Sequence, residues 1–394
     1  MLSMQIDELQ GVRIARVSTV PFFVETQLKH QLSFIAGQGA KVSVVTSNGP
    51  ELSSLEEYNK ITCFPIEIPR AISPWKDLAA LFRLYMFFKR ERIDIAHSTT
   101  PKAGLLTAVA AYFAGVPIRL HTFTGQPWVN LKKRKAFLLR SIDRLIGRLN
   151  TVCYADSFSQ RQFLIDQKIL KARKLMVLGE GSLAGVNLQR FDPKRFSSRH
   201  RDALREGLGI PPKVGVLLFV GRIHTDKGIR ELLQAFSRMK AQGMRTHLVL
   251  IGPLDIGSGM GGRVTREELT SLPDIHFVGY SNVPEDYMAI ADVLCLPSYR
   301  EGFGTVIIEA AAMGVPTVGS KIYGISDAVV DGETGLLVPP RDPVELQKAL
   351  ERLICDQDLR KQMGVAARQR AELKFDANLV SAAVTNEYKR LLKK

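Results

Sequence analysis

The feature that most constrains this fold is an alternation of short β-branched runs with helical stretches, repeated in both halves of the chain. The runs are apolar without strict alternation, as expected for strands buried on both faces of a parallel sheet. They lie at residues 12–17, 41–46, 93–97, 117–122 and 149–155, then at 215–220, 247–251, 276–278, 292–296 and 317–319. Strands separated by helices form βαβ units, so the sequence predicts an α/β protein with two doubly wound parallel sheets.

Length and composition fit two such domains. A chain of 394 residues with 45% hydrophobic and 24% charged residues can bury sizeable cores, which excludes a disordered chain or a single small module. Residues 190–212 are rich in Arg, Ser and Pro and lack periodicity, so we place the linker there. We predict an N-terminal Rossmann-like domain over residues 1–195, a C-terminal one over 196–375, and a helix over 376–394 that packs back towards the first domain.

Cysteine usage and hydropathy indicate the cellular setting. Cys63, Cys153, Cys295 and Cys355 form no C-x-x-C pair and are interpreted as buried thiols in a reducing cytosol. The chain does not open with a basic and then apolar leader. Its longest uncharged stretch, residues 103–118, has 16 residues, whereas roughly 20 are needed to cross a bilayer. We therefore expect neither secretion nor insertion into a membrane.

A turn after the strand at 215–220 predicts an anion site. Gly221-Arg222 and Lys227-Gly228 frame a short loop that opens the helix expected at 229–242. Glycine lets the backbone approach a ligand, the start of a helix presents N–H groups, and the two cations add charge. These features together would hold a diphosphate, and an ordinary charged surface loop is the alternative.

A second turn, within residues 299–310, follows the strand at 292–296. Its Gly302-Phe303-Gly304 segment should expose backbone amides at the start of a helix. Glu309 lies eight residues after Glu301, about two turns further on, and faces the same way if the helix has already formed. Two carboxylates in one cleft suit sugar and ribose hydroxyls. Glu309 could instead be a structural buried group, but an unpaired buried carboxylate is costly and needs a partner.

These turns resemble glycosyltransferase family 4, whose members are retaining enzymes of the GT-B fold. The likeness also includes residues 310–318 and 330–338 and is dense over 214–350. It implies that Arg222 and Lys227 bind the nucleotide diphosphate, that Glu301 and the following loop amides hold the donor sugar, and that Glu309 binds the ribose. The implied donor-binding residues of the C-terminal domain are Gly221, Arg222, Lys227, Tyr280, Glu301, Gly302, Phe303, Gly304, Thr305, Val306 and Glu309.

The first half resembles the same family less densely, and more narrowly its capsule and O-antigen members that act on polyprenyl-linked acceptors. The similar stretches are residues 98–104, 121–128 and 155–157. The family places a histidine near the reacting sugar, so the resemblance assigns His121 to the catalytic set with Glu301, Arg222 and Lys227. A core histidine is the alternative. The turn at residues 18–23 departs from the family's glycine-rich loop.

Positive charge is concentrated in residues 132–174, where twelve Lys or Arg face three Asp, a net +9 out of +15 for the chain. On a helical wheel over 131–149, one side carries Leu131, Leu138, Ile142, Leu145, Ile146 and Leu149, and the other carries Lys133, Arg140, Arg144 and Arg148, with Phe137 inside the basic stripe. Such a helix suits an anionic membrane surface. A solvated outer helix is an equal alternative, and nucleic acid is a third. The membrane-side and acceptor-side set is Lys132, Lys133, Arg134, Phe137, Arg140 and Arg144.

Residues 257–262 spell G-x-G-x-x-G, the dinucleotide fingerprint. Residues 253–256 separate these glycines from the preceding strand, whereas the fingerprint requires them at the strand's own turn. We therefore expect a loop near the donor site here, and no nicotinamide cofactor.

The resemblance implies a peripheral cytoplasmic enzyme at the inner face of the cytoplasmic membrane. Its expected reaction moves an N-acetylated or 6-deoxy hexose, with retention, from a nucleoside-diphosphate sugar, expected to be UDP-linked, to a polyprenyl-diphosphate-linked saccharide in surface polysaccharide synthesis. If Arg222 and Lys227 stabilise the leaving diphosphate, no metal or other cofactor is needed. The alternatives are a nucleotide-sugar 2-epimerase and a nucleic-acid-binding protein. We expect no nucleic acid among the partners.

Overall fold

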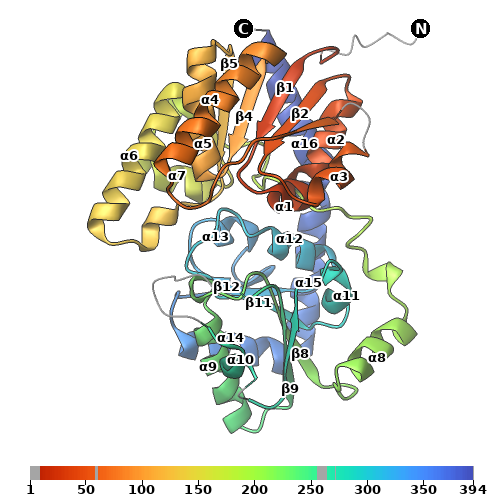
Figure 1. Cartoon of the computed structure of the whole chain (residues 1–394). Helices are drawn as coiled ribbons and strands as arrows, with labels where there is room; N and C mark the ends of the chain where they lie inside the picture. The colour runs from red at the N-terminus through yellow and green to blue at the C-terminus, as the bar shows by residue number, and fades with distance from the viewer. Residues whose placement is uncertain (1–8, 58–60, 255–263, 271, 394) are drawn as a thin grey trace, which may run out of the picture. The chain divides into compact units, whose positions relative to one another are not determined.

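The computed structural model describes residues 9–57, 61–254, 264–270 and 272–393. The chain divides into two compact units (Figure 1). Unit 1 comprises Met1–Gly185 together with Ala377–Lys394, and unit 2 comprises Val186–Asp376. Each unit is built on a parallel sheet, as the alternation of strands and helices predicts.

Unit 1 contains a seven-stranded sheet in the order β3-β2-β1-β4-β5-β6-β7. The strands are β1 (Arg13–Val17), β2 (Lys41–Thr46), β3 (Ile61–Pro65), β4 (Ile95–Thr99), β5 (Ile118–Phe123), β6 (Val152–Ala155) and β7 (Leu175–Met176). The strand order reverses between β1 and β4, and this switch point is where open α/β sheets bind ligands, at the carboxyl ends of the strands.

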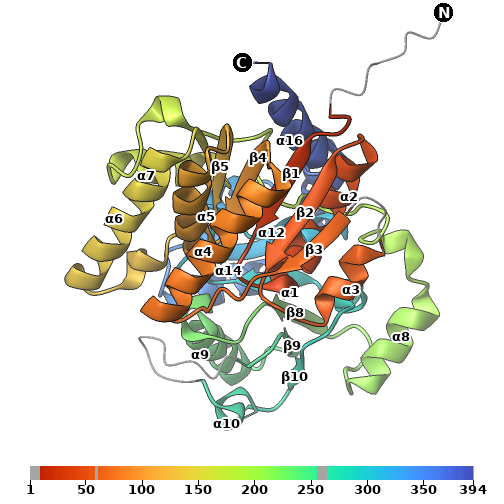
Figure 2. The same cartoon turned by 45° about the horizontal axis from the view of Figure 1, so that its top comes forward.

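Helices cover both faces of this sheet. Ile14 and Ala15 are consecutive on β1 but belong to two different core clusters, as the alternation of side chains along a strand requires. The segments are α1 (Pro21–Phe23), a π-helix at Val24–Leu28, α2 (Lys29–Gly37), α3 (Glu51–Glu56), α4 (Pro74–Glu91), α5 (Pro101–Ala114), α6 (Lys133–Leu149), α7 (Phe158–Asp166) and α16 (Ala377–Leu392). Figures 1 and 2 show α4, α5 and α6 side by side in one layer, and α4 contacts α5 while α5 contacts α6.

Unit 2 contains a six-stranded sheet in the order β10-β9-β8-β11-β12-β13. Its strands are β8 (Gly215–Val220), β9 (Thr246–Ile251), β10 (Ile275–Gly279), β11 (Val293–Leu296), β12 (Thr317–Ser320) and β13 (Gly335–Val338). Its helices are α8 (Ser198–Gly207), α9 (Ile229–Ala241), α10 (Arg266–Leu269), α11 (Pro284–Met288), α12 (Thr305–Ala312), α13 (Ile325–Ala328), α14 (Pro343–Cys355) and α15 (Gln357–Lys374). The sequence patterns did not predict β3, β7 and β13, which are short and lack a long β-branched run.

The structure moves the boundary between the units to Gly185, ten residues before the predicted position. Val186, Phe191 and Phe196 are buried in the core of unit 2, and the region interpreted as a linker contains the helix α8. Apolar residues spaced among Arg, Ser and Pro are enough to bind this segment to unit 2. The expectation of four buried thiols is also wrong in part, because Cys355 is exposed and Cys63 is only half-buried.

The terminal helix α16 is held in unit 1 by a buried polar network. Arg16 on β1 donates from Nη1 to the Tyr388 hydroxyl at 2.8 Å, and that hydroxyl lies 2.6 Å from His97 Nδ1. Burial and the nearby Arg16 charge hold the pKa of His97 well below its ordinary value, so the ring is neutral. Tyr154 donates to Glu387 Oε1 at 2.7 Å. Side chains from three strands therefore meet one face of α16.

We expect Tyr388→Phe to destabilise the protein by about 1–3 kcal/mol, because it removes the buried hydroxyl that accepts from Arg16 and contacts His97, and leaves Arg16 Nη1 with His97 Nδ1 at 2.6 Å. Urea denaturation at neutral pH measures this loss. Tyr112→Phe is the matched control, because Tyr112 is 51% exposed and loss of its hydroxyl should change stability by less than about 0.5 kcal/mol. Equal stability of the two variants would contradict a structural role for the network.

Candidate active site

The two turns singled out in the sequence meet at one edge of the unit 2 sheet. β8 and β11 are neighbouring parallel strands, so the turns that follow them both start at the carboxyl edge. The backbone N–H of Tyr299 in the second turn donates to the carbonyl oxygen of Asp226 in the first at 2.8 Å. The structure thus brings the Lys227 turn and the Glu301 turn together.

Two glycines allow close backbone packing here, Gly228 between the two turns and Gly324 between the loop after β12 and the second turn. Gly228 has φ +69°, and a Cβ there would lie 2.0 Å from the carbonyl oxygen of Pro297. Gly324 has φ +83°, and a Cβ there would lie 2.6 Å from the carbonyl oxygen of Gly302. Any other residue would collide with backbone that has little freedom to move. The glycine in the Lys-Gly pair is therefore needed for packing between the two turns.

Lys227 and Glu301 form an ion pair where the turns meet. Lys227 Nζ lies 2.5 Å from Glu301 Oε1, and Ser298 Oγ donates to the same oxygen at 2.9 Å. Both charged side chains are largely buried, at 17% and 15% exposure. The helix α12 begins at Thr305, so it has not yet formed at Glu301, and the condition under which Glu301 and Glu309 would share a helical face is not met. Loop contacts, and not the helix, orient Glu301.

Asp226 organises the same turn and was not predicted. Its carboxylate accepts from Arg300 Nη2 at 3.2 Å and lies 2.5 Å from His224 Nδ1. Burial pushes the pKa of Asp226 up, but Lys227, His224 and Arg300 outweigh it and hold the pKa below its ordinary value. Asp226 is therefore ionised and links both turns through charge. The only sequence signal was its place beside Lys227.

Glu309 on α12 lies near Arg190 and Glu285. The Arg190 guanidinium donates to both carboxylate oxygens of Glu285, at 2.9 and 2.8 Å, which leaves Glu309 as the second carboxylate beside one cation. Burial raises the pKa of Glu309 to about 7, a rise that Arg190 partly offsets and Glu285 reinforces. Within the described chain, no side chain donates a hydrogen bond to the Glu309 carboxylate. Sequence reasoning missed Arg190 and Glu285, which lie 95 residues apart.

The remaining predicted donor-site residues lie around the same sheet edge. Gly304, at φ +84°, is the N-cap of α12, so Thr305 and Val306 open the helix where N–H groups have no helical acceptor. Phe303 is 2% exposed and packs on Phe375 at 5.1 Å between ring centroids, which restricts its role to the backbone. Arg222 follows β8 and is exposed, as is Tyr280, which follows β10. Gly221 and Gly302 complete the two turns.

In unit 1, His121 on β5 is 1% exposed. Its Nδ1 lies 2.9 Å from Ser98 Oγ, and burial lowers its pKa to about 3, so the ring is neutral. Gly104 on α5 makes room for it, because a Cβ there would lie 2.4 Å from the imidazole. His121 lies just beneath the carboxyl edge of the sheet, and its catalytic role stays a prediction.

The helical wheel of α6 is correct only in part: Ile146 is buried and Leu131 and Ile142 pack on the core as expected, but other positions differ. Leu138 and Leu145, expected on the buried side, are 55% and 39% exposed, whereas Arg140 stacks on Trp128 at 4.6 Å and Arg144 donates to the carbonyl oxygen of Lys168 at 3.0 Å. Buried Asp143 accepts from the Trp128 indole at 2.7 Å, so a carboxylate occupies part of the buried face of α6. Lys132, Lys133, Arg134 and Phe137 are exposed as predicted.

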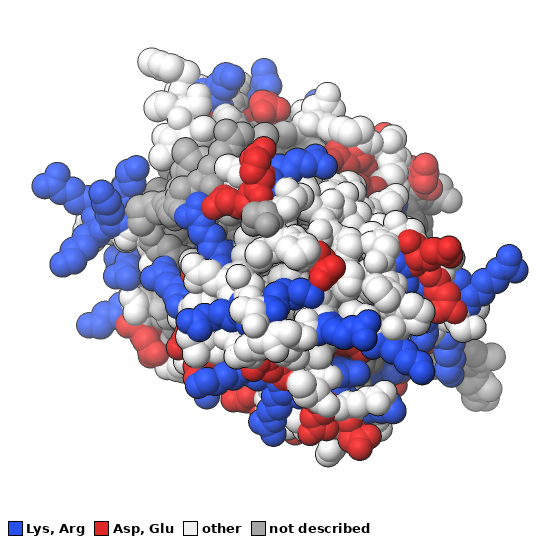
Figure 3. Space-filling view, turned by 90° about the horizontal axis from the view of Figure 1, so that it is seen from below, with Lys and Arg blue, Asp and Glu red and all other residues white. Residues whose placement is uncertain are grey.

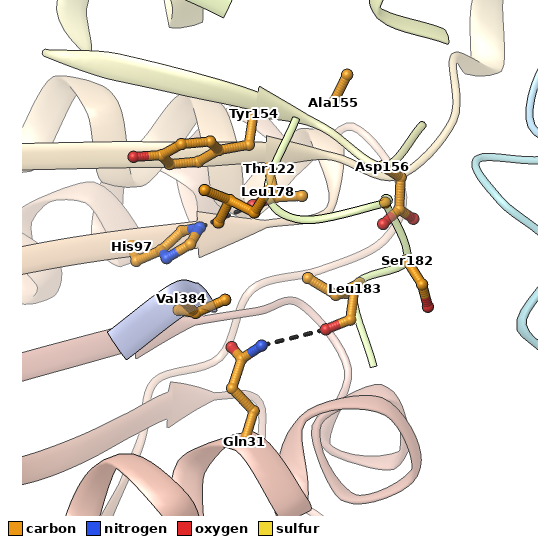
Figure 4. A pocket seen from close by; sticks show the side chains of 11 residues that line it. Gln31, His97, Thr122, Tyr154, Ala155, Asp156, Leu178, Ser182, Leu183 and Val384 are labelled. Atoms are coloured by element: carbon orange, nitrogen blue, oxygen red, sulfur yellow. Dashed lines mark hydrogen bonds between the residues drawn. The ribbon is translucent and has the colours of Figure 1, made fainter. Parts of the chain in front are cut away.

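A small cavity in unit 1 (Figure 4) does not compete as a substrate site. Its volume is about 20 Å³, room for roughly one water molecule. Its polar walls include Gln31, His97, Thr122 and Asp156, and His97 Nε2 lies 2.8 Å from Thr122 Oγ1. Burial raises the pKa of Asp156 to about 7. The cavity is too small for a sugar.

Over the described residues, no three His, Cys, Asp or Glu side chains are grouped to hold a metal ion. Asp356-Gln357-Asp358 spells an acidic pair, but Asp356 is the N-cap of α15 and accepts from the Leu359 amide at 2.9 Å. Among the helices of the described chain, none is both long and apolar enough to cross a bilayer. The G-x-G-x-x-G segment at 257–262 lies outside the described residues.

Comparisons with known proteins agree with this architecture. The family of group 1 glycosyl transferases matches residues 200–370, and a glycosyl transferase 4-like domain matches 24–181. The capsular polysaccharide biosynthesis glycosyltransferase CapM of Staphylococcus aureus is 31% identical over 368 residues, which cover 93% of this chain and 94% of CapM.

Two solved structures share the fold. Anabaena HepE in complex with UDP and glucose has a TM-score of 0.79 at 19% identity, over 96% of this chain and 99% of HepE. A Listeria monocytogenes protein described as a UDP-N-acetylglucosamine 2-epimerase has a TM-score of 0.64 at 12% identity, over 96% and 97%. The fold and the matches define a two-domain glycosyltransferase of the GT-B class. Within that class, the chain belongs to the group 1, family 4-type glycosyltransferases close to capsule enzymes.

The pH dependence of the free energy of unfolding should reveal the ionisation of Glu309. Its folded-state pKa of about 7 lies above the ordinary value of 4.5, so the folded protein holds the proton more tightly than the unfolded chain. Glu309 therefore lowers the free energy of unfolding progressively between about pH 4.5 and pH 7, and no further above that. We expect Glu309→Gln to gain stability over the wild type across this window, measured by urea denaturation.

Glu285→Gln is the contrasting variant, because Arg190 bonds Glu285 directly. Its loss should leave Arg190 without its partner and destabilise the protein at pH 7. If the difference in free energy of unfolding between Glu309→Gln and the wild type did not change with pH, burial would not be raising the pKa of the Glu309 carboxyl.

Proposed function

We propose that this protein is a retaining glycosyltransferase of surface polysaccharide synthesis, with a nucleoside-diphosphate sugar as donor. The observation that carries the proposal is the Lys227–Glu301 ion pair at 2.5 Å, in which a cation for the diphosphate lies beside a carboxylate for the sugar. The donor is expected to be UDP-linked and to carry an N-acetylated or 6-deoxy hexose. The neighbouring backbone at Gly304 and Thr305 supplies amide donors.

In this scheme, the diphosphate lies over the first turn and the sugar over the second. Arg222 and Lys227 counter the negative charge that develops on the leaving diphosphate, and donors arranged before the reaction stabilise such charge most effectively. Lys227 is paired with Glu301, so the charge of this lysine is compensated within the protein. Sugar hydroxyls can donate to the Glu301 carboxylate, which is an acceptor only.

Glu309 is proposed to bind the ribose of the nucleotide. Its carboxylate is destabilised by burial and by Glu285, and two ribose hydroxyls would supply the donors that the protein does not provide. In this proposal, the same burial that makes Glu309 lower the stability of the folded protein prepares its carboxylate to bind the ribose hydroxyls. Tyr280, exposed after β10, is proposed to flank the base.

The proposed reaction follows the family's retaining route. The acceptor hydroxyl attacks the anomeric carbon on the face from which the diphosphate departs, the bond from that carbon to the diphosphate breaks, and a diphosphate oxygen takes the hydroxyl proton. His121, neutral at physiological pH, is proposed to hydrogen-bond near the reacting sugar. The protein's cations carry the charge, so the proposal includes no metal and no other cofactor.

The proposed acceptor is a saccharide on a polyprenyl diphosphate at the inner face of the cytoplasmic membrane. Support comes from the capsular role in the name of CapM and from the exposed Lys132, Lys133, Arg134 and Phe137 on and before α6. Figure 3 shows Lys and Arg mixed with Asp and Glu over much of one face, while a group of Lys and Arg side chains projects from the left edge, the side on which α6 lies in Figure 1. An anionic surface would meet such a group.

A 2-epimerase remains the second candidate, because a protein so described shares the fold. Epimerisation changes the donor without an acceptor and needs an acid and a base at the sugar. The Glu301 carboxylate is already bonded to Lys227 and Ser298, and no second acid–base group stands beside it in the candidate site as predicted from the sequence. Nucleic-acid binding would leave Glu301 and Glu309 without a purpose.

Incubation with candidate UDP- and GDP-sugars, with and without bacterial lipid extract, tests the proposed function. We expect labelled sugar to enter the lipid fraction only when both donor and extract are present, with release of the nucleoside diphosphate. Epimerised donor sugar in the absence of extract would establish the epimerase instead. If the protein transferred sugar to a water-soluble acceptor as well as to the lipid fraction, the proposal of a lipid-linked acceptor would be wrong.

Arg222→Ala and Lys227→Ala should each lower kcat/KM by an amount equivalent to about 2 to 4 kcal/mol of transition-state stabilisation, as for the loss of one oxyanion donor. Arg238→Ala is the matched control, because Arg238 is an exposed cation on α9, the helix that Lys227 precedes. The melting temperature of Arg222→Ala should stay close to the wild type because Arg222 is exposed, whereas Lys227→Ala should also lose stability because it leaves the Glu301 carboxylate without its cation. Near wild-type turnover in both site variants would remove the diphosphate assignment.

A further inference from the structure

The helix α4 of unit 1 has an exposed apolar ridge. Its members lie three or four residues apart and so share one face of the helix. They are Trp75, Leu78, Phe82 and Met86, with exposures of 84%, 57%, 62% and 49%. The opposite face packs into the core through Ala80, Leu84, Phe87 and Phe88. The helix thus has two apolar faces, and the folded unit covers only one of them.

Basic side chains flank the ridge. Lys76, Arg83, Lys89 and Arg90 are exposed on α4. The two acidic residues of the helix are already paired, Asp77 with Lys102 at 2.6 Å and Glu91 with Arg90 at 2.8 Å. An apolar ridge with aromatic residues and basic flanks is typical of a helix that lies in a membrane interface. Tryptophan in particular favours that depth.

An open groove lies beside the ridge, between α4 and the end of β3. Its volume is about 630 Å³, and its lining is mostly apolar, with Phe64, Ile66, Phe82 and Met86 near Arg83 and Arg90. Such a groove offers further apolar contact below a basic rim. Lipid presents the complementary pair, acyl chains beneath anionic headgroups.

The neighbouring helices extend this surface. α5 packs between α4 and α6, and Figures 1 and 2 show the three helices in one layer. α6 adds Phe137 and Leu138, which are 68% and 55% exposed, beside Lys133 and Arg134. Both α4 and α6 follow strands of a parallel sheet, so both begin at its carboxyl edge, where such sheets bind their ligands.

We propose that α4 is the element that inserts into an anionic bilayer, with Trp75, Leu78, Phe82 and Met86 at the boundary of headgroups and acyl chains. This inference rests on the proposed function for its purpose, because a lipid-linked acceptor must be met at the bilayer. Lys102 Nζ donates to the carbonyl oxygen of Ala71 and pairs with Asp77, so the loop before α4 and its first turn are held in place. The ridge is therefore presented by a fixed helix.

The two tryptophans of the chain provide a direct probe. Trp75 is 84% exposed and Trp128 is 1% exposed, so a change on lipid binding should come from Trp75. We expect vesicles of phosphatidylglycerol and phosphatidylcholine to shift the emission of the full chain to shorter wavelength, and brominated acyl chains to quench it. Trp75→Phe should abolish the shift while the protein still sediments with the vesicles.

The double variant Leu78→Gln/Phe82→Gln should lower the vesicle partition coefficient by about tenfold or more, and both positions are exposed, so folding should not suffer. Val365→Gln/Leu373→Gln on α15 is the matched control, with exposures of 60% and 76%. Equal vesicle binding by the two double variants, or no emission shift in a bound wild type, would overturn the proposal. So would a lipid-free dimer that only the α4 variant loses, since a second copy would then cover the ridge.

The result is separable from that of the proposed function. If the enzyme transfers sugar to lipid-linked acceptor but the α4 variant binds vesicles and works as well as the wild type, only this inference fails. If Trp75 enters the bilayer but no candidate donor and lipid extract support transfer, only the proposed function fails. Nucleotide binding should be the same in both double variants.

Discussion

The parallel pairing of β8 with β11 is the constraint on which the candidate active site depends. It brings to one sheet edge two turns that lie more than 70 residues apart, and the hydrogen bond from Tyr299 to Asp226 joins them. The Lys227–Glu301 pair spans 74 residues and exists only because of that adjacency. Gly228 allows the contact, since a side chain there would strike Pro297. The order of the strands in the sheet therefore determines which side chains can meet in the candidate site.

Charge balance explains how so many ionic groups can be partly buried in these turns. Lys227 is matched by Glu301 and Arg300 by Asp226, and each pair joins one turn to the other, so desolvation is offset between the two turns. Glu309 is the exception, because Arg190 is already bonded to Glu285. Strained groups of this kind cluster where a ligand completes the missing interactions. Glu301 therefore has a cationic partner of its own in the protein, whereas Glu309 shares one that is already bonded to another carboxylate.

The sequence predicted what depends on local backbone demands. Both parallel sheets and the Gly221 and Gly302 turns follow from patterns of a few residues, because glycine positions and buried strands leave a direct trace. The Arg190–Glu285 pair did not, since its members lie 95 residues apart and meet only after folding. The unit boundary was misplaced because Phe191 and Phe196 are isolated among polar residues. Glu301 and Glu309 were predicted together, but the loop before α12, not a shared helix, positions the first.

The helices α4 and α6 show why a helical wheel drawn from the sequence cannot identify which face of a helix is exposed to solvent. On α6, Asp143 is buried and bonded to Trp128, whereas Leu138 and Leu145 are exposed. On α4, residues of the same apolar kinds occupy both faces, and only the packing against α5 reveals which of them the core uses. Because apolar residues lie on two faces of α4 with charged residues between them, the sequence does not show which face the core uses, and Trp75 and Phe82 give no signal of exposure. Their open position costs solubility without helping this domain to fold, and that cost is offset only when a partner covers the ridge. Because the flanking groups are basic and the paired acids are neutralised, an anionic lipid surface meets both the apolar and the charged requirements of α4.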